Sequence, residues 1–235
     1  MSINRWIPLE SNPEVLNKWS EKAGLLTARA AFQDVYGLDP ELLAMVNQPV
    51  KAVVLLFPIT DALEAKRREE DQKITNEGPS VLDSTVLWIK QTIPNACGTI
   101  GLLHALANSN VELAPNSPLA RFIEECKAKT PEERAKHLET TPLFANIHAE
   151  AASGGQTAVP TDLDTDLHFT CFVQAGSPGA YRIVELDGRR AGPVDRGALE
   201  KDLLTDVAKI VKETYVSNTS SVQFSMVALG GPPEV

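Results

Sequence analysis

The apolar run at residues 52–57, Ala-Val-Val-Leu-Leu-Phe, is the feature that most constrains the fold, because all six of its side chains are apolar. A strand of this composition is buried on both faces, so it belongs inside a sheet that other elements cover from each side. At 235 residues the chain is long enough to bury such a core. We therefore expect layers of helices against a central sheet.

Further strands are predicted from alternation and turn signals. The segments 167–173 and 181–186 flank a turn that contains glycine and proline, and this spacing predicts an antiparallel hairpin with an enlarged turn. Apolar residues alternate over 222–228, which predicts a final strand. We also expect a short strand at 86–89. With no internal repeat and no clear boundary, the chain is expected to form one α+β domain, residues 1–235, with a largely antiparallel central sheet flanked by helices.

Helix starts are marked by capping residues. Asn12-Pro13 and Ser117-Pro118 each place a good N-cap before a proline at the first helical position, and Thr130 with Glu133 forms a capping-box pattern. The highly charged segment 61–73 predicts a solvated helix or lid. Apolar residues at helical spacing over 199–211 predict a further helix.

The segment 146–166 is rich in Ala, Gly, Ser, Thr and Asp and has little periodicity. We expect it to be irregular. An irregular segment of this length inside a compact domain is usually a lid, a binding loop or a disordered segment.

Charge and cysteine content exclude several classes of protein. The formal net charge is −9, which argues against a nucleic-acid-binding protein. Three cysteines without a CxxC spacing indicate neither a disulfide framework nor a structural zinc site, so we expect a reduced, cytoplasmic protein without metal or cofactor. The first residues lack the apolar core of a signal peptide, and no apolar run is long enough to cross a membrane.

Cys97 is the first candidate for chemistry. Asn95 is a good N-cap, which would place Cys97 in the first turn of an apolar helix. The N–H groups and the dipole of that turn favour a thiolate. Gly98 would leave room beside the sulfur for a substrate backbone. The alternative is an inert core cysteine, the usual state of this residue; the helical spacing of Cys126 and the strand alternation of Cys171 favour core packing for both.

A catalytic thiol needs a base, and His168 is the best candidate because it begins an apolar strand, where a polar ring requires a reason. Its alternative is a histidine satisfied by a local hydrogen bond. Asp187 ends the next strand and could orient the His168 ring, although Asp187-Gly188 alone predicts only a turn. Gln91, six residues before the thiol, could donate to an oxyanion or could be a surface glutamine.

The other three histidines fit other roles. His104 lies two helical turns after Cys97, about 10 Å away, and is expected to be a packed, hydrogen-bonded residue. His137 is expected to be solvated in a charged helix. His148 is expected to open the irregular segment.

Together these positions resemble a known family. The pattern Q-x-x-x-N-A-C-G-x-x-x-L-L-H-A-L-A at 91–107 is similar to the active-site signature of the ubiquitin C-terminal hydrolases, which are cysteine-dependent deubiquitinases. RWIPLESNPEVLNKW near the start, LHFTCFV and ELDGR resemble the family's amino-terminal, histidine and aspartate segments, and FSMVALG resembles its closing strand. The resemblance covers nearly the whole chain.

The resemblance implies a site and a fold. It implies Cys97 as nucleophile, His168 as general base, Asp187 as the carboxylate that orients the base, and Gln91 as oxyanion donor. It also implies a papain-like cysteine protease core, a knotted backbone, and a crossover loop at 146–166 that passes over the active site.

The resemblance also implies a substrate. The reaction would be hydrolysis of esters, thioesters and amides at the carboxyl-terminal glycine of ubiquitin, with small or unfolded adducts preferred. Glu10 and Glu14 are acidic candidates for contacts with the basic ubiquitin surface, and Asn95 and Gly98 are further candidates for substrate binding. The protein would act as a monomer. Three alternatives remain: a preference for another ubiquitin-like modifier, a different thiol hydrolase, and an inactive ubiquitin-binding protein. The intact set of Gln, Cys, His and Asp argues against the inactive protein.

Overall fold

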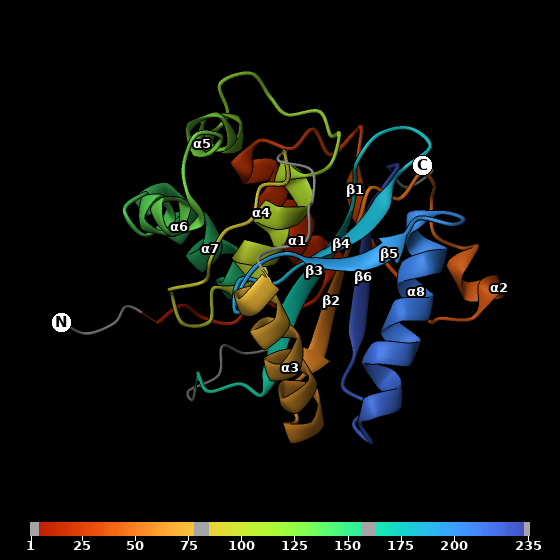
Figure 1. The fold of residues 1–235 in the computed structure, drawn as a ribbon. Helices are drawn as coiled ribbons and strands as arrows, with labels where there is room; N and C mark the ends of the chain where they lie inside the picture. Colours follow the sequence, from red (N-terminus) through yellow and green to blue (C-terminus); the bar gives the residue numbers. More distant parts are fainter. Residues whose placement is uncertain (1–4, 78–84, 157–162, 233–235) are drawn as a thin grey trace.

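A six-stranded sheet lies at the centre of the computed structural model, which describes residues 5–77, 85–156 and 163–232 (Figure 1). Its strand order is β1-β6-β2-β3-β4-β5, and every neighbouring pair is antiparallel, as the sequence predicts. The strands are β1 (Ala31–Asp34), β2 (Ala52–Pro58), β3 (Leu167–Ala175), β4 (Arg182–Leu186), β5 (Val194–Ala198) and β6 (Ser225–Gly230).

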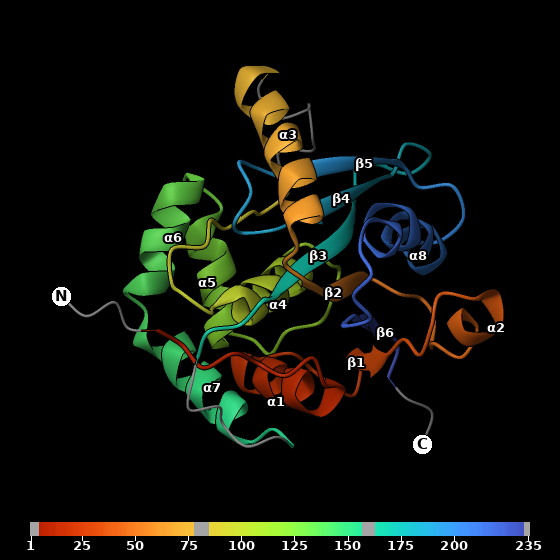
Figure 2. The ribbon, with the colours of Figure 1, turned by 90° about the horizontal axis from the view of Figure 1, so that it is seen from below.

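Helices cover both faces of this sheet (Figure 2). Those that the structure describes are α1 (Pro13–Ala23), α2 (Pro40–Leu43), α3 (Asp61–Glu77), α4 (Cys97–Ala107), α5 (Pro118–Cys126), α6 (Pro131–Glu139), α7 (Pro142–Ser153) and α8 (Leu203–Thr214), followed by the 3₁₀ helix Val216–Asn218. The helices α1 and α4 to α7 lie on one side, and α8 with α2 lies on the other. None of the helices in the described residues is long and apolar enough to span a membrane.

The two faces of the sheet carry separate clusters of buried apolar side chains. Along β2, Val54 belongs to the cluster under α1 and α4, whereas Val53 and Leu55 belong to the cluster under α8. All three side chains are at most 1% exposed. The prediction of a strand buried on both faces is therefore confirmed.

Three predicted helix starts are also confirmed. The Asn12 side chain accepts the amide of Glu14 at 2.8 Å, and the Ser117 side chain accepts that of Ala120 at 3.3 Å. Thr130 and Glu133 exchange the two hydrogen bonds of a capping box. These local patterns predict helix starts well because both partners lie within one turn.

Residues 86–89 do not form the predicted strand. The segment is extended, but it bonds to the end of α4 instead of joining the sheet. The amide of Leu87 donates to the Asn108 side chain at 2.6 Å, and the amide of Ile89 donates to Nε2 of His104 at 2.9 Å. Side chains therefore satisfy the backbone groups that a neighbouring strand would otherwise bind.

The prediction that 146–166 is irregular is wrong for its first eight residues, because α7 continues to Ser153. Ile147, His148 and Ala151 follow one another at helical spacing and are buried together on one face. The alanines that made the segment look unpatterned favour a helix. Irregular chain is found at 154–156 and 163–166, while 157–162 lies outside the described residues.

Candidate active site

Three polar side chains from distant parts of the chain meet at one end of the β3–β4 hairpin. Cys97 is the first residue of α4, His168 is the second residue of β3, and Asp187 follows β4 directly. The antiparallel register pairs Cys171 with Leu186, which places His168 and Asp187 at the same end. Nε2 of His168 lies 2.7 Å from Oδ1 of Asp187, and neither side chain is more than 4% exposed.

The Cys97 thiol lies beside the His168 ring, close enough for each group to shift the pKa of the other. Burial raises the pKa of Cys97, but the hydrogen bond and charge of His168, together with the backbone of Phe169, outweigh it and bring the pKa below its ordinary value. Burial lowers the pKa of His168, but the charge and hydrogen bond of Asp187 outweigh it and raise the pKa to about 10. These opposite directions favour a thiolate beside an imidazolium at neutral pH.

Both predictions for Asp187 agree with the structure, since the residue is in a turn and its side chain also contacts His168. The amide of Arg190 donates to its carbonyl at 3.2 Å, and the amide of Arg189 donates to Oδ1 at 2.8 Å. Burial raises the pKa of Asp187, but His168 and the Arg189 amide outweigh it and hold the pKa below the usual range. The carboxylate is therefore ionised and fixed against the ring.

Gln91 is attached to the same turn through its backbone. Its amide donates to the carbonyl of Gly188 at 2.8 Å, and a Cβ at position 188 would lie 2.8 Å from the Gln91 Cβ. Glycine is therefore required for this close approach. The Gln91 side chain donates to the carbonyl of Ile93 at 3.2 Å, and its Oε1 is buried with no hydrogen bond in the described residues. Its role as oxyanion donor stays a prediction.

Asn95 is not the N-cap that its residue type suggested. Ala96 occupies that position, and Asn95 has a φ of 62°, which asparagine tolerates better than most residues. Its side chain donates to the carbonyl of Leu163 at 2.8 Å. The prediction that Cys97 lies in the first helical turn is nevertheless confirmed.

The other residues predicted to bind substrate also make contacts within the protein. A Cβ at Gly98 would lie 3.0 Å from the Leu9 side chain, so the absent side chain makes room for the amino-terminal segment. Glu10 accepts the amide of Gln156 at 3.0 Å. With the bond from Asn95 to Leu163, these contacts hold the chain on either side of 157–162. A role in substrate binding stays a prediction for Glu10, Asn95 and Gly98.

Of the expectations for the remaining histidines, that for His104 is confirmed, that for His137 holds in part because its side chain is 24% exposed, and that for His148 is wrong. His104 is buried and hydrogen-bonded as expected. His137 is not freely solvated, because its ring stacks on Phe122 and its Nε2 lies 2.7 Å from Glu125. His148 does not open a loop: it is buried in α7 and bonds to the Thr99 hydroxyl at 2.9 Å.

The remaining cysteines are buried without such partners. Burial raises the pKa of Cys126 to about 11 and that of Cys171 well above its usual range. Both are inert core residues, as predicted. Within the described chain, no group of three or more His, Cys, Asp or Glu side chains could hold a metal ion.

A thiolate-forming cysteine at a helix start, paired with an imidazole that a carboxylate orients, is the arrangement of a cysteine hydrolase. Comparison with known proteins gives the family. The family model for "Ubiquitin carboxyl-terminal hydrolase, family 1" matches residues 6–216. The chain belongs to this family.

Relatives with the same description match nearly full length. Ubiquitin carboxyl-terminal hydrolase 3 of Arabidopsis thaliana is 42% identical, over 97% of this chain and 95% of its own. Ubiquitin carboxyl-terminal hydrolase isozyme L1 of Rattus norvegicus is 38% identical, over 94% of this chain and 96% of its own. The UCH37 catalytic domain of Trichinella spiralis, solved with ubiquitin vinyl methyl ester, has the same fold, with a TM-score of 0.73 at 21% identity over 98% of this chain and 97% of its own.

Sequence reasoning missed two residues that contact the Asp187 turn. The indole Nε1 of Trp88 donates to the Asp187 carbonyl at 3.0 Å, and the Arg190 side chain is buried beneath α3. Trp88 was assigned only as part of the strand predicted at 86–89. Arg190 directly follows the motif ELDGR, but nothing in the local sequence marks an arginine as buried.

Proposed function

We propose that this protein hydrolyses bonds to the carboxyl-terminal glycine of ubiquitin through Cys97, His168 and Asp187. The observation that carries the proposal is the thiol–imidazole–carboxylate arrangement, with the 2.7 Å contact between His168 and Asp187. Membership of the family supplies the substrate class. The UCH37 domain solved with ubiquitin vinyl methyl ester supports ubiquitin as the bound partner.

The reaction follows from the protonation states of the pair. The Cys97 thiolate attacks the carbonyl carbon of the terminal glycine, and the His168 imidazolium donates its proton to the departing oxygen, sulfur or nitrogen. The neutral ring then takes a proton from water, which attacks the thioester and releases ubiquitin and the thiol. Asp187 keeps the ring in one orientation and stabilises its positive charge in both steps.

The oxyanion of each tetrahedral intermediate needs donors near the thiol. The backbone amide of Cys97 is in the first turn of α4, where amides have no helical partner. Gln91 supplies a second donor once its side-chain amide exchanges the Ile93 carbonyl for the substrate oxygen. The glycines at the end of ubiquitin leave room for both.

We further propose that the crossover loop predicted at 146–166, whose irregular part in the described residues is 154–156 and 163–166, favours small or unfolded adducts by limiting what can thread beneath it. Its described ends are tied by Glu10 to Gln156 and by Asn95 to Leu163. We further propose that residues 1–235 act as one catalytic domain, as a monomer, in the cytoplasm. The three free cysteines are consistent with that compartment.

Cys97→Ala is the direct test of the proposed nucleophile. The variant should lose hydrolysis of a fluorogenic ubiquitin carboxyl-terminal amide and labelling by ubiquitin vinyl methyl ester, because both need the thiolate. It should still bind ubiquitin, since the remaining surface is intact. Retained turnover in the variant would contradict the proposal. An unreactive wild type would indicate a binding protein, and faster turnover of another modifier's amide would indicate a different substrate.

A further inference from the structure

The turn that carries Asp187 determines where its carboxylate points. Because Arg189 donates to the side chain of Asp187 and Arg190 donates to its carbonyl, the carboxylate and the backbone of the turn are fixed to each other. A shift of the turn therefore moves Oδ1 relative to the His168 ring. Whatever holds the turn holds the carboxylate.

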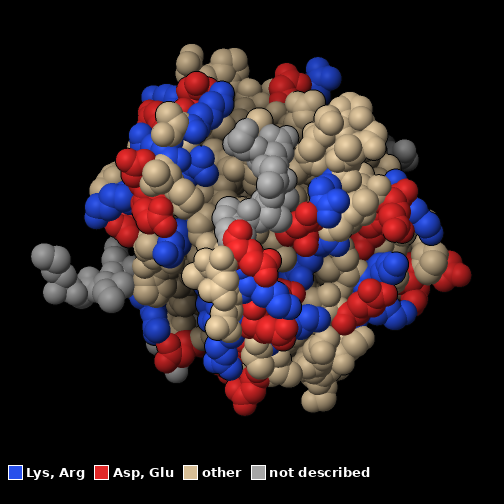
Figure 3. Space-filling model, viewed as in Figure 1, with Lys and Arg blue, Asp and Glu red and all other residues tan. Residues whose placement is uncertain are grey.

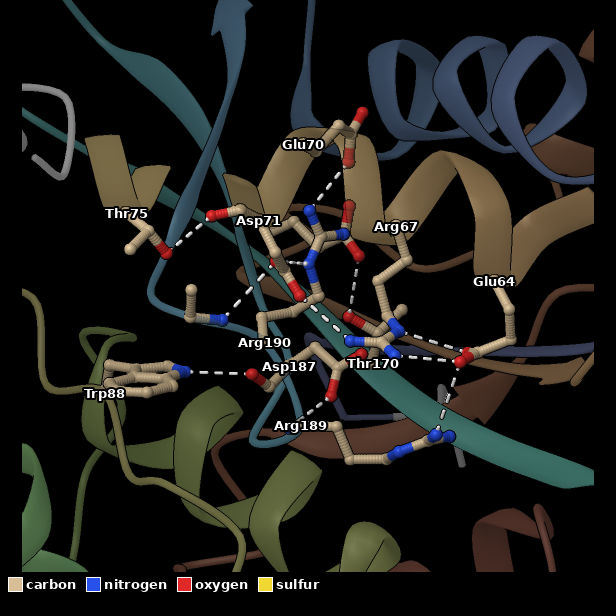
Figure 4. Close-up of polar contacts among 12 residues, drawn as sticks. Glu64, Arg67, Glu70, Asp71, Thr75, Trp88, Thr170, Asp187, Arg189 and Arg190 are labelled. Atoms are coloured by element: carbon tan, nitrogen blue, oxygen red, sulfur yellow. Dashed lines mark hydrogen bonds and ion pairs between the residues drawn. The ribbon is translucent and has the colours of Figure 1, made fainter. Parts of the chain in front are cut away.

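Trp88 holds the turn from inside the core. Its indole Nε1 donates to the Asp187 carbonyl at 3.0 Å, and the residue is 5% exposed (Figure 4). A tryptophan buried in this way is anchored by its ring, so its single N–H defines a fixed point for the carbonyl. A phenylalanine at this position would keep most of the packing but not the hydrogen bond.

Arg190, which belongs to the turn, attaches it to α3. Its guanidinium lies under α3, with Nε 2.6 Å from Asp71 and a terminal nitrogen 2.7 Å from Glu70, and its side chain is 4% exposed. Figure 4 shows both carboxylates of α3 reaching down to this arginine. A buried guanidinium with two carboxylate partners is held in one position and orientation.

The helix α3 is itself attached mainly by charged groups. Leu63 is its only fully buried side chain, and charged residues of both signs are interspersed over the face of the molecule that α3 occupies (Figure 3). Glu70 also binds Arg196, and Asp71 also binds Arg67. A cavity of about 30 Å³, lined by Asp187 and by charged side chains of α3, lies beneath the helix. The ion pairs therefore serve as the main link between α3 and the turn.

We propose that Trp88 and Arg190 are positioning residues that attach the Asp187 turn to the core and to α3, so that the docking of α3 through Glu70 and Asp71 keeps the carboxylate aligned with His168. The inference rests on the proposed role of Asp187 in orienting the histidine. It adds α3, more than a hundred residues away in the chain, to the parts that set the state of the active site.

The charged groups around the pair allow the direction of the effect to be worked out. Those that face His168 or Asp187 are Cys97 and His104 of α4, Arg67 of α3, Arg189 and Arg190 of the turn, and Tyr215 after α8. Glu185 of β4 acts in turn on Arg190 and Tyr215. Removing the positive charge of Arg190 without moving Asp187 would favour the imidazolium and raise the pKa of His168. Misplacing the carboxylate would lower that pKa. Loss of charge alone and displacement of the Asp187 carboxylate therefore predict opposite changes in the pKa of His168.

The test is a titration of His168 by NMR in protein with ¹⁵N-labelled histidine, which needs no ubiquitin. His168 is distinct because the pKa values of His104 and His148 are about 4 and its own is about 10. The variants are Arg190→Met and Trp88→Phe, with Arg182→Met as the matched control. Arg182, the first residue of β4, also forms a 2.6 Å ion pair, but its partner is Asp195 and not a carboxylate of α3. Arg190→Met is suited to the test because both carboxylates of α3 still have a cationic partner in this variant. Glu70 still binds Arg196, and Asp71 still binds Arg67.

We expect the pKa of His168 to fall by about one unit in Arg190→Met and in Trp88→Phe, and to stay unchanged in Arg182→Met. The turnover rate for the ubiquitin amide at pH 7.5 should fall about tenfold in both variants with little change in KM. The titration of His104 near pH 4 reports whether each variant is folded. A pKa of His168 that is unchanged or raised in either folded variant would overturn the proposal. A wild type that shows the titration but does not hydrolyse ubiquitin conjugates would overturn the proposed function instead.

Discussion

At the scale of single residues, burial has opposite consequences for the three cysteines. Cys97 is buried beside an imidazolium, so its pKa is lowered, whereas Cys126 is buried among apolar groups and its pKa is raised to about 11. The thiolate is the reactive form, so the neighbouring histidine makes one of three buried thiols a nucleophile.

This difference predicts selective alkylation. Iodoacetamide at pH 6.5 should modify Cys97 in the folded protein and leave Cys126 and Cys171 unmodified, as measured by mass spectrometry of the digested protein. In urea all three should react at comparable rates, since the lowered pKa of Cys97 requires the folded site. Cys97→Ala is the control and should take up no label when folded. Modification of Cys126 before Cys97 would contradict the assignment.

Residue-scale prediction from sequence succeeds where the chemistry is carried by the residue type and its neighbours. The predicted contact between His168 and Asp187 is present, whereas the catalytic roles of Cys97, His168, Asp187 and Gln91 stay predictions. Asn95 was assigned wrongly because its left-handed backbone depends on a distant carbonyl. Arg190 could not be predicted at all, since its partners lie on α3, about 120 positions earlier.

At the scale of elements, α4 is the helix on which the site depends. Every residue from Cys97 to Leu106 is buried, and the helix packs on β3 and β2. Such a helix has little freedom to shift, so the sulfur at its first residue is held in place by the core. Two glycines within it, Gly98 and Gly101, meet different surroundings.

These glycines provide a matched pair of stability predictions. A Cβ at Gly101 would make ordinary contacts, at 3.7 Å to Val54 and 3.8 Å to Phe169, so Gly101→Ala should raise the free energy of unfolding by about 0.5–1 kcal/mol. Gly98→Ala places the Cβ 3.0 Å from Leu9 and should give no gain or a loss. Urea unfolding of both variants checks the order, and a larger gain from Gly98→Ala would contradict it.

Elements were predicted correctly where their signal was strong and local. The apolar run of β2 and the capping box of α6 were sufficient. The helix α7 was missed because its buried face is made partly of alanine and histidine, which give little contrast with its exposed face. The segment 86–89 was assigned as a strand because the sequence indicates its extended backbone. The sequence does not indicate that the side chains of Asn108 and His104 accept its backbone hydrogen bonds.

At the scale of the whole molecule, two histidines are enclosed as neutral rings in the core. Burial lowers the pKa of both His104 and His148 to about 4. In the unfolded chain these rings take up protons near pH 6.5, whereas in the folded protein they do not until about pH 4. The stabilisation is therefore complete above about pH 6.5 and is lost as the pH falls to about 4.

We expect the free energy of unfolding to fall steeply between pH 6.5 and 4, by up to about 3 kcal/mol for each of these histidines. His148→Gln should lower stability at pH 7, because the Trp6 ring contact is lost. It should also make the fall with acid shallower by about one proton. Urea unfolding at several pH values measures both effects. A slope identical to that of the wild type would contradict the burial of a neutral His148.

The place of β6 in the sheet determines when synthesis can produce a finished molecule. This strand comes last along the chain, yet it lies between β1 and β2 and pairs with both. While the chain emerges from a ribosome, those two earlier strands have open edges, and open edges recruit other strands. Translation that stops before residue 225 would therefore release an incomplete sheet prone to aggregate, so a stop codon just before β6 should be as damaging as one many residues earlier.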